Sequence, residues 1–249
     1  MTAIDYSVDE IVELLKRTNL PTIVVEGSDD VVVYRHLEDR LSSIGADVLP
    51  TAGRDKLLQV FERRREFISF AKVVFIADRD TWVHTGIPLD YSSDILIFTD
   101  GYSIENDAYR DGQLENLLLN WERDRFHEEL STFLSWYAIA LTRHLDNPIE
   151  KIDLHPNQIF QGDCPVAFLT LRDGEAFPDG LCQELKDNYA KMLRGKSLIN
   201  LLVRQTTRPG RRPSHKPLTL LEFVAAKPGQ YLLSIEDRVS RCLAGEESG

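Results

Sequence analysis

Five carboxylates in the first half of the sequence could together support metal-dependent chemistry; along the chain they are Glu26, Asp30, Asp78, Asp80 and Glu105. Carboxylates crowded together repel one another, so a shared site requires cations or protons to neutralise part of the charge. Oxygen ligands without cysteine or histidine suit Mg²⁺, and Mn²⁺ is the other candidate. Such an ion activates water and stabilises the charge that develops on a phosphodiester during cleavage. These residues therefore predict a metal-dependent hydrolytic centre.

Each acid also has an ordinary structural explanation, because an Asp after a strand is commonly a helix cap or a turn residue. Glu26 is different, since a carboxylate directly after an apolar run and before Gly27 is an unusual cap. Asp78 and Asp80 stand two residues apart, and in an extended chain such residues project to the same side. The joint occurrence of EGxxD and DxD therefore favours a common site over separate caps.

Apolar segments that alternate with helical patterns predict the scaffold that positions these acids. Strand-like runs occupy residues 22–26, 46–51, 72–78 and 94–100. Helical patterns occupy residues 7–17, with Ser7 and Glu10 as a capping-box pair, then Ser28 to about Leu41, and 54–68. The alternation predicts an α/β Rossmann-like fold with a mostly parallel four-stranded sheet flanked by helices. In such sheets, active sites form at the carboxyl ends of the strands, where these acids stand.

The pattern beyond residue 110 is mainly helical. Residues 113–145 predict two helices with a turn near His127. Residues 146–182 read mostly as loop, and further helices are predicted at 183–193, 197–205, 218–226 and 230–243. We therefore expect three parts, namely an N-terminal helix at 1–20, a catalytic core at 21–110, and a mainly helical region at 111–249 with a basic segment at 191–216.

The basic segment contrasts with the charge of the whole chain. The 249 residues carry a formal net charge of −11 at pH 7, which alone argues against a general nucleic-acid binder. No acidic residue occurs between Asp187 and Glu222, however. The candidates for phosphate contacts in this stretch are Arg194, Arg204, Arg208, Arg211, Arg212 and Lys216. The segment either holds a nucleic-acid backbone or is a solvated loop that balances charge locally.

Several classes of site and location have no signature in the sequence. The three cysteines are widely spaced and the six histidines form no HExxH pair, which argues against a disulfide framework and a zinc site. The acidic start of the chain does not resemble a signal peptide, and no apolar run approaches the roughly 20 residues of a bilayer crossing. We therefore expect a cytoplasmic protein without a membrane partner.

The segment TAGRDKLLQV (51–60) places Gly53 and Arg54 after a strand, where they could bind phosphate at a helix N-terminus. It lacks the spacing of a P-loop, and the sequence contains no nucleotide-hydrolysis motif. If ATP matters to this protein, a partner must supply the hydrolysis.

Three segments, VVEGSDD, FIADRD and TDGYSIEND, resemble the TOPRIM domain shared by topoisomerases, primases and OLD-family nucleases. The resemblance covers roughly residues 21–110. The EGxxD form and the SIEN element are most similar to the OLD-type nuclease branch. The length and the helical second half resemble the TOPRIM effectors of PARIS anti-phage defence systems, which work with an ABC-type ATPase.

The resemblance implies a role for each acid. Glu26 would be the TOPRIM glutamate, acting as a metal ligand or as a general base. Asp78 and Asp80 would be the metal ligands of the DxD pair. Asp30 and Glu105 would complete a two-metal site of the OLD type, with Mg²⁺ as the cofactor.

The resemblance also implies a substrate and partners. Lys196, in LRGKSLINLL, matches a GK element of related effectors and would stabilise the charged transition state. Such effectors are implied to cut RNA, particularly tRNA, and so to halt translation in an infected cell. A free tRNA-cutting enzyme would kill its host, so an ABC-type ATPase sensor is expected to hold it inactive until infection. A homodimer is expected for the active form, because OLD-type relatives pair.

Three other functions stay open from the sequence. The same centre could cut DNA, because DNA and RNA offer the metals the same phosphodiester. The domain could instead be a catalytically inactive subunit that binds or regulates the ATPase, although the presence of Glu26, Asp78 and Asp80 together argues against this. Primase-like nucleotidyl transfer ranks last, since the chain is short and has no zinc-binding module.

Overall fold

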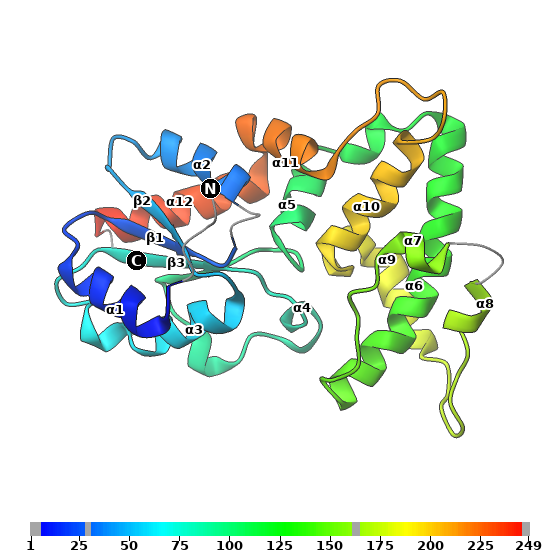
Figure 1. Cartoon of the computed structure of the whole chain (residues 1–249), viewed down its shortest axis with the longest axis horizontal. Coiled ribbons are helices and arrows are strands. Elements are labelled where there is room, and N and C mark those ends of the chain that lie inside the picture. Colours follow the sequence, from blue (N-terminus) through cyan, green and yellow to red (C-terminus); the bar gives the residue numbers. More distant parts are fainter. Residues whose placement is uncertain (1–5, 28–30, 161–164, 246–249) are drawn as a thin grey trace.

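Figure 1 shows a chain in two halves, a sheet with helices on both faces and a group of helices beside it. The computed structural model describes residues 6–27, 31–160 and 165–245. No helix within these ranges combines the length and the apolarity that a bilayer crossing requires.

Four parallel strands form the sheet, in the order β2-β1-β3-β4. They are β1 (Thr22–Val25), β2 (Asp47–Pro50), β3 (Val73–Ala77) and β4 (Leu96–Phe98). Thr22 pairs in register with Asp47 on one side and with Val73 on the other, so β1 is a central strand. Every residue of β1 and β3 is buried, which explains why their sequences are continuous apolar runs. The predicted α/β fold and its parallel sheet are confirmed.

Helices α1 (Val8–Arg17) and α3 (Arg54–Glu62) cover one face of the sheet. The predicted capping box of Ser7 and Glu10 begins α1. The helix α3 ends at Glu62 rather than at residue 68, and a 3-10 turn follows at Arg64–Glu66. Apolar side chains of both helices, such as Leu15, Leu57 and Phe61, pack against one side of the strands. The strand residues of this core include Val24 and Phe75. Alternate strand residues point to opposite faces, so this core is distinct from the one on the other face.

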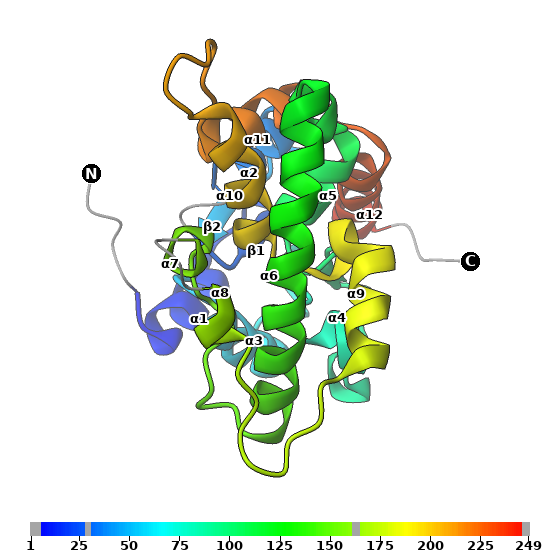
Figure 2. The same cartoon turned by 90° about the vertical axis from the view of Figure 1, so that its right-hand side faces the viewer.

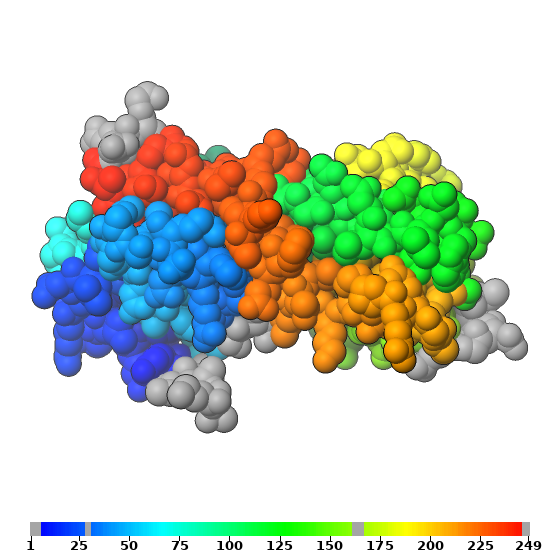
Figure 3. All heavy atoms as spheres, turned by 90° about the horizontal axis from the view of Figure 1, so that it is seen from above, coloured from blue at the N-terminus to red at the C-terminus, as the bar shows by residue number. Residues whose placement is uncertain are grey.

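Four helices cover the opposite face, namely α2 (Val31–Arg40), α5 (Ile104–Asp111), α11 (Pro217–Ala226) and α12 (Gln230–Ala244). The helix α11 packs against α2, and α12 contacts β3, β4 and α5. Figure 3 shows the red α12 and the orange α11 beside the blue α2. The last two helices therefore complete the sheet-containing half. The structure differs here from the expected division at residue 110, because residues 217–244 return to the core.

One continuous helix, α6 (Asn120–Asp146), runs through the helical half (Figure 2). The predicted turn near His127 is wrong, because Phe126, Leu130 and Phe133 continue one buried face through this point. Around it lie α7 (Pro156–Ile159), α8 (Pro165–Phe168), α9 (Asp179–Met192) and α10 (Gly195–Thr206). Short connecting elements are α4 (Trp82–Thr85) and 3-10 turns at Leu89–Tyr91 and Leu114–Leu117. Buried side chains of α6, α9 and α10 join the core on the α2 face of the sheet.

Candidate catalytic centre

The carboxyl ends of β1 and β3 bring Glu26 and Asp78 together. The two strands are neighbours in register, so the residues that follow them adjoin at one edge of the sheet. Glu26 Oε1 accepts a hydrogen bond of 2.7 Å from the backbone N–H of Asp78. Two of the acids identified in the sequence are therefore in direct contact.

The N-terminus of α5 adjoins this pair. Asp78 Oδ1 accepts a hydrogen bond of 2.9 Å from the backbone N–H of Ile104, the first residue of α5. Unpaired N–H groups and the helix macrodipole favour a carboxylate at this position. Glu105, the next residue, is buried, and its Oε2 accepts a hydrogen bond of 2.5 Å from Ser103 Oγ.

Two further polar residues of the SIEND segment fix the loop after β4, a role that the sequence analysis did not assign. Asp107 is buried and accepts hydrogen bonds from the backbone N–H groups of Asp100, at 2.9 Å, and Gly101, at 2.8 Å. Asn106 Nδ2 donates to the carbonyl of Leu193 at 2.9 Å. These bonds hold the start of α5 against the end of α9, so both halves of the molecule shape the centre.

Asp80 has a different partner from Asp78. Its backbone lies in the left-handed region, with φ of 49°, and its N–H donates to the carbonyl of Tyr102 at 2.7 Å. The expectation that both DxD residues project from extended chain is wrong, because β3 ends at Ala77. Asp80 Oδ2 accepts a hydrogen bond of 3.1 Å from Arg54 Nη1. Burial raises the pKa of Asp80, and the positive charge of Arg54 opposes this effect.

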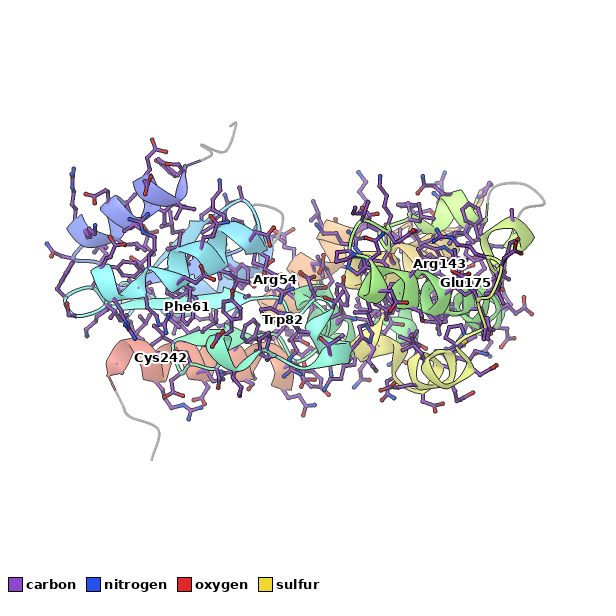
Figure 4. The ribbon with its side chains drawn as sticks, turned by 90° about the horizontal axis from the view of Figure 1, so that it is seen from below. Arg54, Phe61, Trp82, Arg143, Glu175 and Cys242 are labelled. Carbon is purple, nitrogen blue, oxygen red and sulfur yellow. The ribbon has the colours of Figure 1, made fainter. Side chains whose placement is uncertain are left out.

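Arg54, the first residue of α3, is held rigidly beside Asp80. Its guanidinium carbon lies 3.8 Å from the centroid of the Trp82 ring, and its side chain is 14% exposed. Its Nε and Nη2 atoms are buried and have no hydrogen-bond partner among the described residues. Figure 4 shows Arg54 and Trp82 where the two halves meet. Unmatched guanidinium N–H groups suit an anion such as a phosphate oxygen.

A pocket of about 670 Å³ lies beside Arg54 and Asp80. Its lining includes Arg194, which directly precedes α10, and Tyr102 from the loop after β4. Burial raises the pKa of Tyr102 far above its usual value, so this phenol keeps its proton and can donate it in a hydrogen bond. The size of the pocket suits a nucleotide unit or another small ligand.

The GK pair at the start of α10 lies against the start of α5. A Cβ on Gly195 would stand 2.2 Å from Ser103 Oγ and 2.9 Å from Glu105 Cβ, so glycine permits this close approach. Lys196 and Glu105 line one pocket of about 250 Å³. The fold thus brings Lys196 close to the acids, although 91 residues separate it from Glu105 (196 − 105).

Four of the five predicted metal ligands lie within the described residues. No group of three or more His, Cys, Asp or Glu side chains that could hold a metal ion occurs among the described residues. Asp30 lies outside those residues. Asp80 accepts a hydrogen bond from Arg54, and Glu105 accepts one from Ser103. The oxygen-only chemistry of Glu26 and Asp78 fits a hard cation such as Mg²⁺, so these two residues would hold it.

Three of the predicted phosphate-binding arginines form ion pairs with acidic residues of α6. Arg211 Nε donates to Glu122 Oε1 at 2.8 Å, and the Glu122 side chain is fully buried. Arg204 Nε donates to Glu129 Oε2 at 2.9 Å, and Arg208 Nη2 lies 3.6 Å from the same carboxylate. The guanidinium of Arg211 is fixed by its ion pair with the buried Glu122. Local sequence pattern gives no signal for pairs so distant along the chain.

The other three of the six predicted phosphate contacts are Arg194, Arg212 and Lys216. Arg194 lines the pocket beside Asp80. Arg212 and Lys216 are exposed in the loop between α10 and α11. Binding of nucleic acid by these residues, and by Arg204 and Arg208, stays a prediction.

The fold and the centre together define a class, an α/β Rossmann-like protein with acids at the carboxyl edge of a parallel sheet and cations around them. No protein-family model and no curated protein matches the chain. The function therefore has to be argued from the geometry of the centre itself.

Proposed function

We propose that the chain is a Mg²⁺-dependent endonuclease of the TOPRIM type. The observation that carries the proposal is the contact of the Glu26 carboxylate with Asp78, whose own carboxylate caps α5. Cationic side chains stand beside two of the other predicted acids, with Lys196 in the Glu105 pocket and Arg54 in the Asp80 pocket. Acids that suit a hard cation, next to cations that suit phosphate, are what metal-dependent phosphodiester cleavage requires.

Each group has a task in this proposal. Glu26 and Asp78 would hold Mg²⁺, and the ion would supply an activated water and neutralise charge on the phosphodiester. The N–H groups of Asp78 and Ile104 orient these two carboxylates. Arg54 places a positive charge at the Asp80 pocket, where it favours a phosphate group, and Lys196 balances the negative charge that grows in the transition state.

The proposed substrate is RNA, with tRNA favoured, and the proposed partner is an ABC-type ATPase sensor. This part rests on the resemblance to the PARIS effectors and in particular to AriB, which works with the ATPase AriA. The enzyme would act in the cytoplasm as a homodimer, and the ATPase would hold it inactive until phage infection. Restraint is necessary because unregulated tRNA cleavage would stop translation in the host.

One observation favours a second candidate, a regulatory or binding subunit without catalysis. Asp80, one of the predicted metal ligands, is already paired with Arg54. A chain of this kind would use its sheet edge to contact the ATPase rather than a substrate. Cleavage of DNA by the same centre is the alternative among enzymes.

The test is a cleavage assay on total RNA and on plasmid DNA, with Mg²⁺, with Mn²⁺ and with a chelator. The assay compares the purified parent protein with Glu26→Ala. Each protein is tested alone and after co-expression with an ATPase encoded beside it. The matched control is Glu184→Ala, because Glu184 is exposed on α9. We expect discrete tRNA fragments that need the metal, persist in the control and fall at least about 100-fold in Glu26→Ala.

The other outcomes decide among the alternatives. Nicked plasmid without RNA fragments would show that the enzyme cleaves DNA and not RNA. No cleavage of either substrate, together with cellular toxicity that Glu26→Ala does not change, would remove the catalytic proposal and leave the regulatory subunit.

A further inference from the structure

A third, strongly basic pocket is lined by residues of α6, of α10 and of the chain at α7, and none of the five predicted acids lines it. Figures 1 and 2 show these helices in the half of the molecule beside the sheet. It measures about 700 Å³. Three arginines line it, Arg125 from α6, Arg204 from α10 and Arg208 from the chain just after α10. Other polar side chains complete much of the wall; they are His155, Asn157, Asn200 and Thr207.

The three guanidinium groups share a single carboxylate. Glu129 lies 2.9 Å from Arg204, and 3.6 Å from each of Arg125 and Arg208. The nearby acid Glu122 is engaged by Arg211. Three positive charges against one negative charge leave a net local charge of +2 in a chain whose total is −11.

This excess of positive charge has an energetic cost. Burial, followed by the neighbouring charge of Arg125, lowers the pKa of Arg208, while Glu129 acts in the opposite direction. An anion that entered the pocket would relieve this repulsion. A phosphate group is the natural fit, because guanidinium groups bind its oxygens through paired N–H donors.

The basic pocket is linked to the acidic centre through one side chain. Asn200, on α10, lines both the basic pocket and the pocket of Glu105 and Lys196. Lys196 and Arg204 are eight residues apart on α10 (204 − 196), which is about 12 Å along a helix. One nucleotide of a helical strand advances by roughly 3.4 Å, so this length corresponds to three or four nucleotides.

We propose that this basic pocket, named here the Arg204 pocket, holds the phosphodiester backbone of the nucleic acid three or four nucleotides from the bond that is cut. The inference rests on the proposed nuclease function and adds the path that the strand follows along α10. Glu129 positions the arginines, and Arg125 and Arg208 contact the phosphate. The polar side chains of the wall accommodate the sugars without reading the bases.

The experiment measures binding without cleavage, so that it is independent of catalysis. Full-length protein carrying Glu26→Ala is titrated with labelled tRNA and with a short single-stranded DNA over a range of KCl concentrations. The test variant adds Arg125→Gln and Arg208→Gln. The control adds Arg17→Gln and Arg65→Gln, which make the same change of charge on exposed residues of the sheet half.

We expect the test variant to bind tRNA at least about 10-fold more weakly at low salt. The slope of log K against log salt should decrease in magnitude by about 0.7 to 0.9 per arginine. The control should keep the parent affinity and slope. Arg125→Gln alone covers the case in which the double variant misfolds, because Arg125 is half exposed and its ion pair is long. Equal weakening for the DNA strand would identify a general backbone site, and weakening for tRNA alone would identify an RNA site.

Several results would overturn the inference. One is a test variant that binds as the control does, and another is a parent protein that binds neither strand. A third is loss of affinity for a mononucleotide such as ATP without any loss for tRNA, which would make the pocket a nucleotide site. Cleavage is measured separately, in protein that keeps Glu26 and carries Arg125→Gln and Arg208→Gln. Unchanged cleavage by this protein would refute the proposed strand path along α10 but not the proposed nuclease function.

Discussion

Gly195 allows α10 to approach α5 closely. A Cβ at this position would stand 2.2 Å from Ser103 Oγ and 2.7 Å from Asn106 Oδ1, so the Ala variant must push the two helix ends apart. We expect Gly195→Ala to lower the free energy of unfolding by about 1 to 3 kcal/mol. It should also impair any cleavage activity, because Lys196 moves with the helix. Urea denaturation and the cleavage assay measure the two effects.

The matched control for this prediction is Gly180→Ala. Gly180 also lies in the first turn of a helix, α9, but an added Cβ there meets nothing within 4 Å. This variant should be neutral, or more stable by up to about 1 kcal/mol, because alanine restricts the unfolded chain. If Gly195→Ala behaved like this control, the tight contact between α10 and α5 would not exist in solution.

His84, in α4, makes the stability depend on pH. Burial lowers the pKa of its imidazole to about 4, although contact with the backbone of Met192 acts in the opposite direction. The folded state therefore favours the neutral ring, whereas the unfolded chain takes up a proton as the pH falls below its usual value of about 6.5. The free energy of unfolding should fall by at most roughly 3 kcal/mol between pH 6.5 and pH 4 for this reason.

Urea denaturation at pH 7 and pH 4.5 tests the contribution of His84. The loss of stability between the two conditions should be smaller in His84→Gln than in the parent protein. His215→Gln, in the loop after α10, should keep the loss of the parent. An equal loss in all three proteins would show that His84 does not carry the pH dependence.

At the scale of elements, the ion pair between Arg211 and Glu122 fixes the loop after α10 to α6. Burial would raise the pKa of Glu122, but Arg211 and the N–H of Leu119 hold it below its usual value. Arg211→Ala would leave this buried carboxylate without its cation, at a cost of about 3 kcal/mol or more in unfolding free energy. Arg212 is exposed, so Arg212→Ala should change the unfolding free energy by less than about 0.5 kcal/mol.

Denaturation combined with the tRNA titration distinguishes two roles for Arg211. A structural residue loses stability when replaced and affects RNA binding only through the altered loop. Unchanged stability with weakened binding would instead return Arg211 to the set of phosphate contacts predicted from the sequence.

The sequence predicted elements best where burial or capping determined the residue types. The strands β1 and β3 are apolar throughout because both faces are buried, and the Ser7 capping box marked the start of α1. Prediction from the sequence failed where a local pattern was ambiguous. The turn predicted near His127 falls inside one continuous helix, whose buried face includes Phe126 and Leu130.

The candidate site was predictable in part for related reasons. Parallel strands in register place Glu26 beside Asp78, so topology alone predicted that contact. The left-handed backbone at Asp80 is set by its bond to Tyr102, which no local rule supplies. Pairs such as Arg54 with Asp80 depend on tertiary packing, and so they were found only in the structure.

At the scale of the whole molecule, the two halves are joined by a common core. Buried residues of the sheet, such as Ile23 and Ile76, belong to the same cluster as Phe133 and Trp136 of α6. The return of α11 and α12 also closes the chain around the sheet. Both features indicate that the sheet-containing half and the helical half unfold together, in one cooperative transition.

The three tryptophans allow this prediction to be tested, because Trp82 reports on the sheet half and Trp136 on α6. One protein keeps only Trp82 and another keeps only Trp136, with the remaining tryptophans replaced by Phe. In each protein, the urea midpoint from fluorescence should equal the midpoint from far-UV circular dichroism, which follows both halves. Comparing two probes within one protein removes any effect of the replacements on stability. Midpoints that differ between the probes would show that the halves unfold separately, and residues 111–249 would then contain an independent unit.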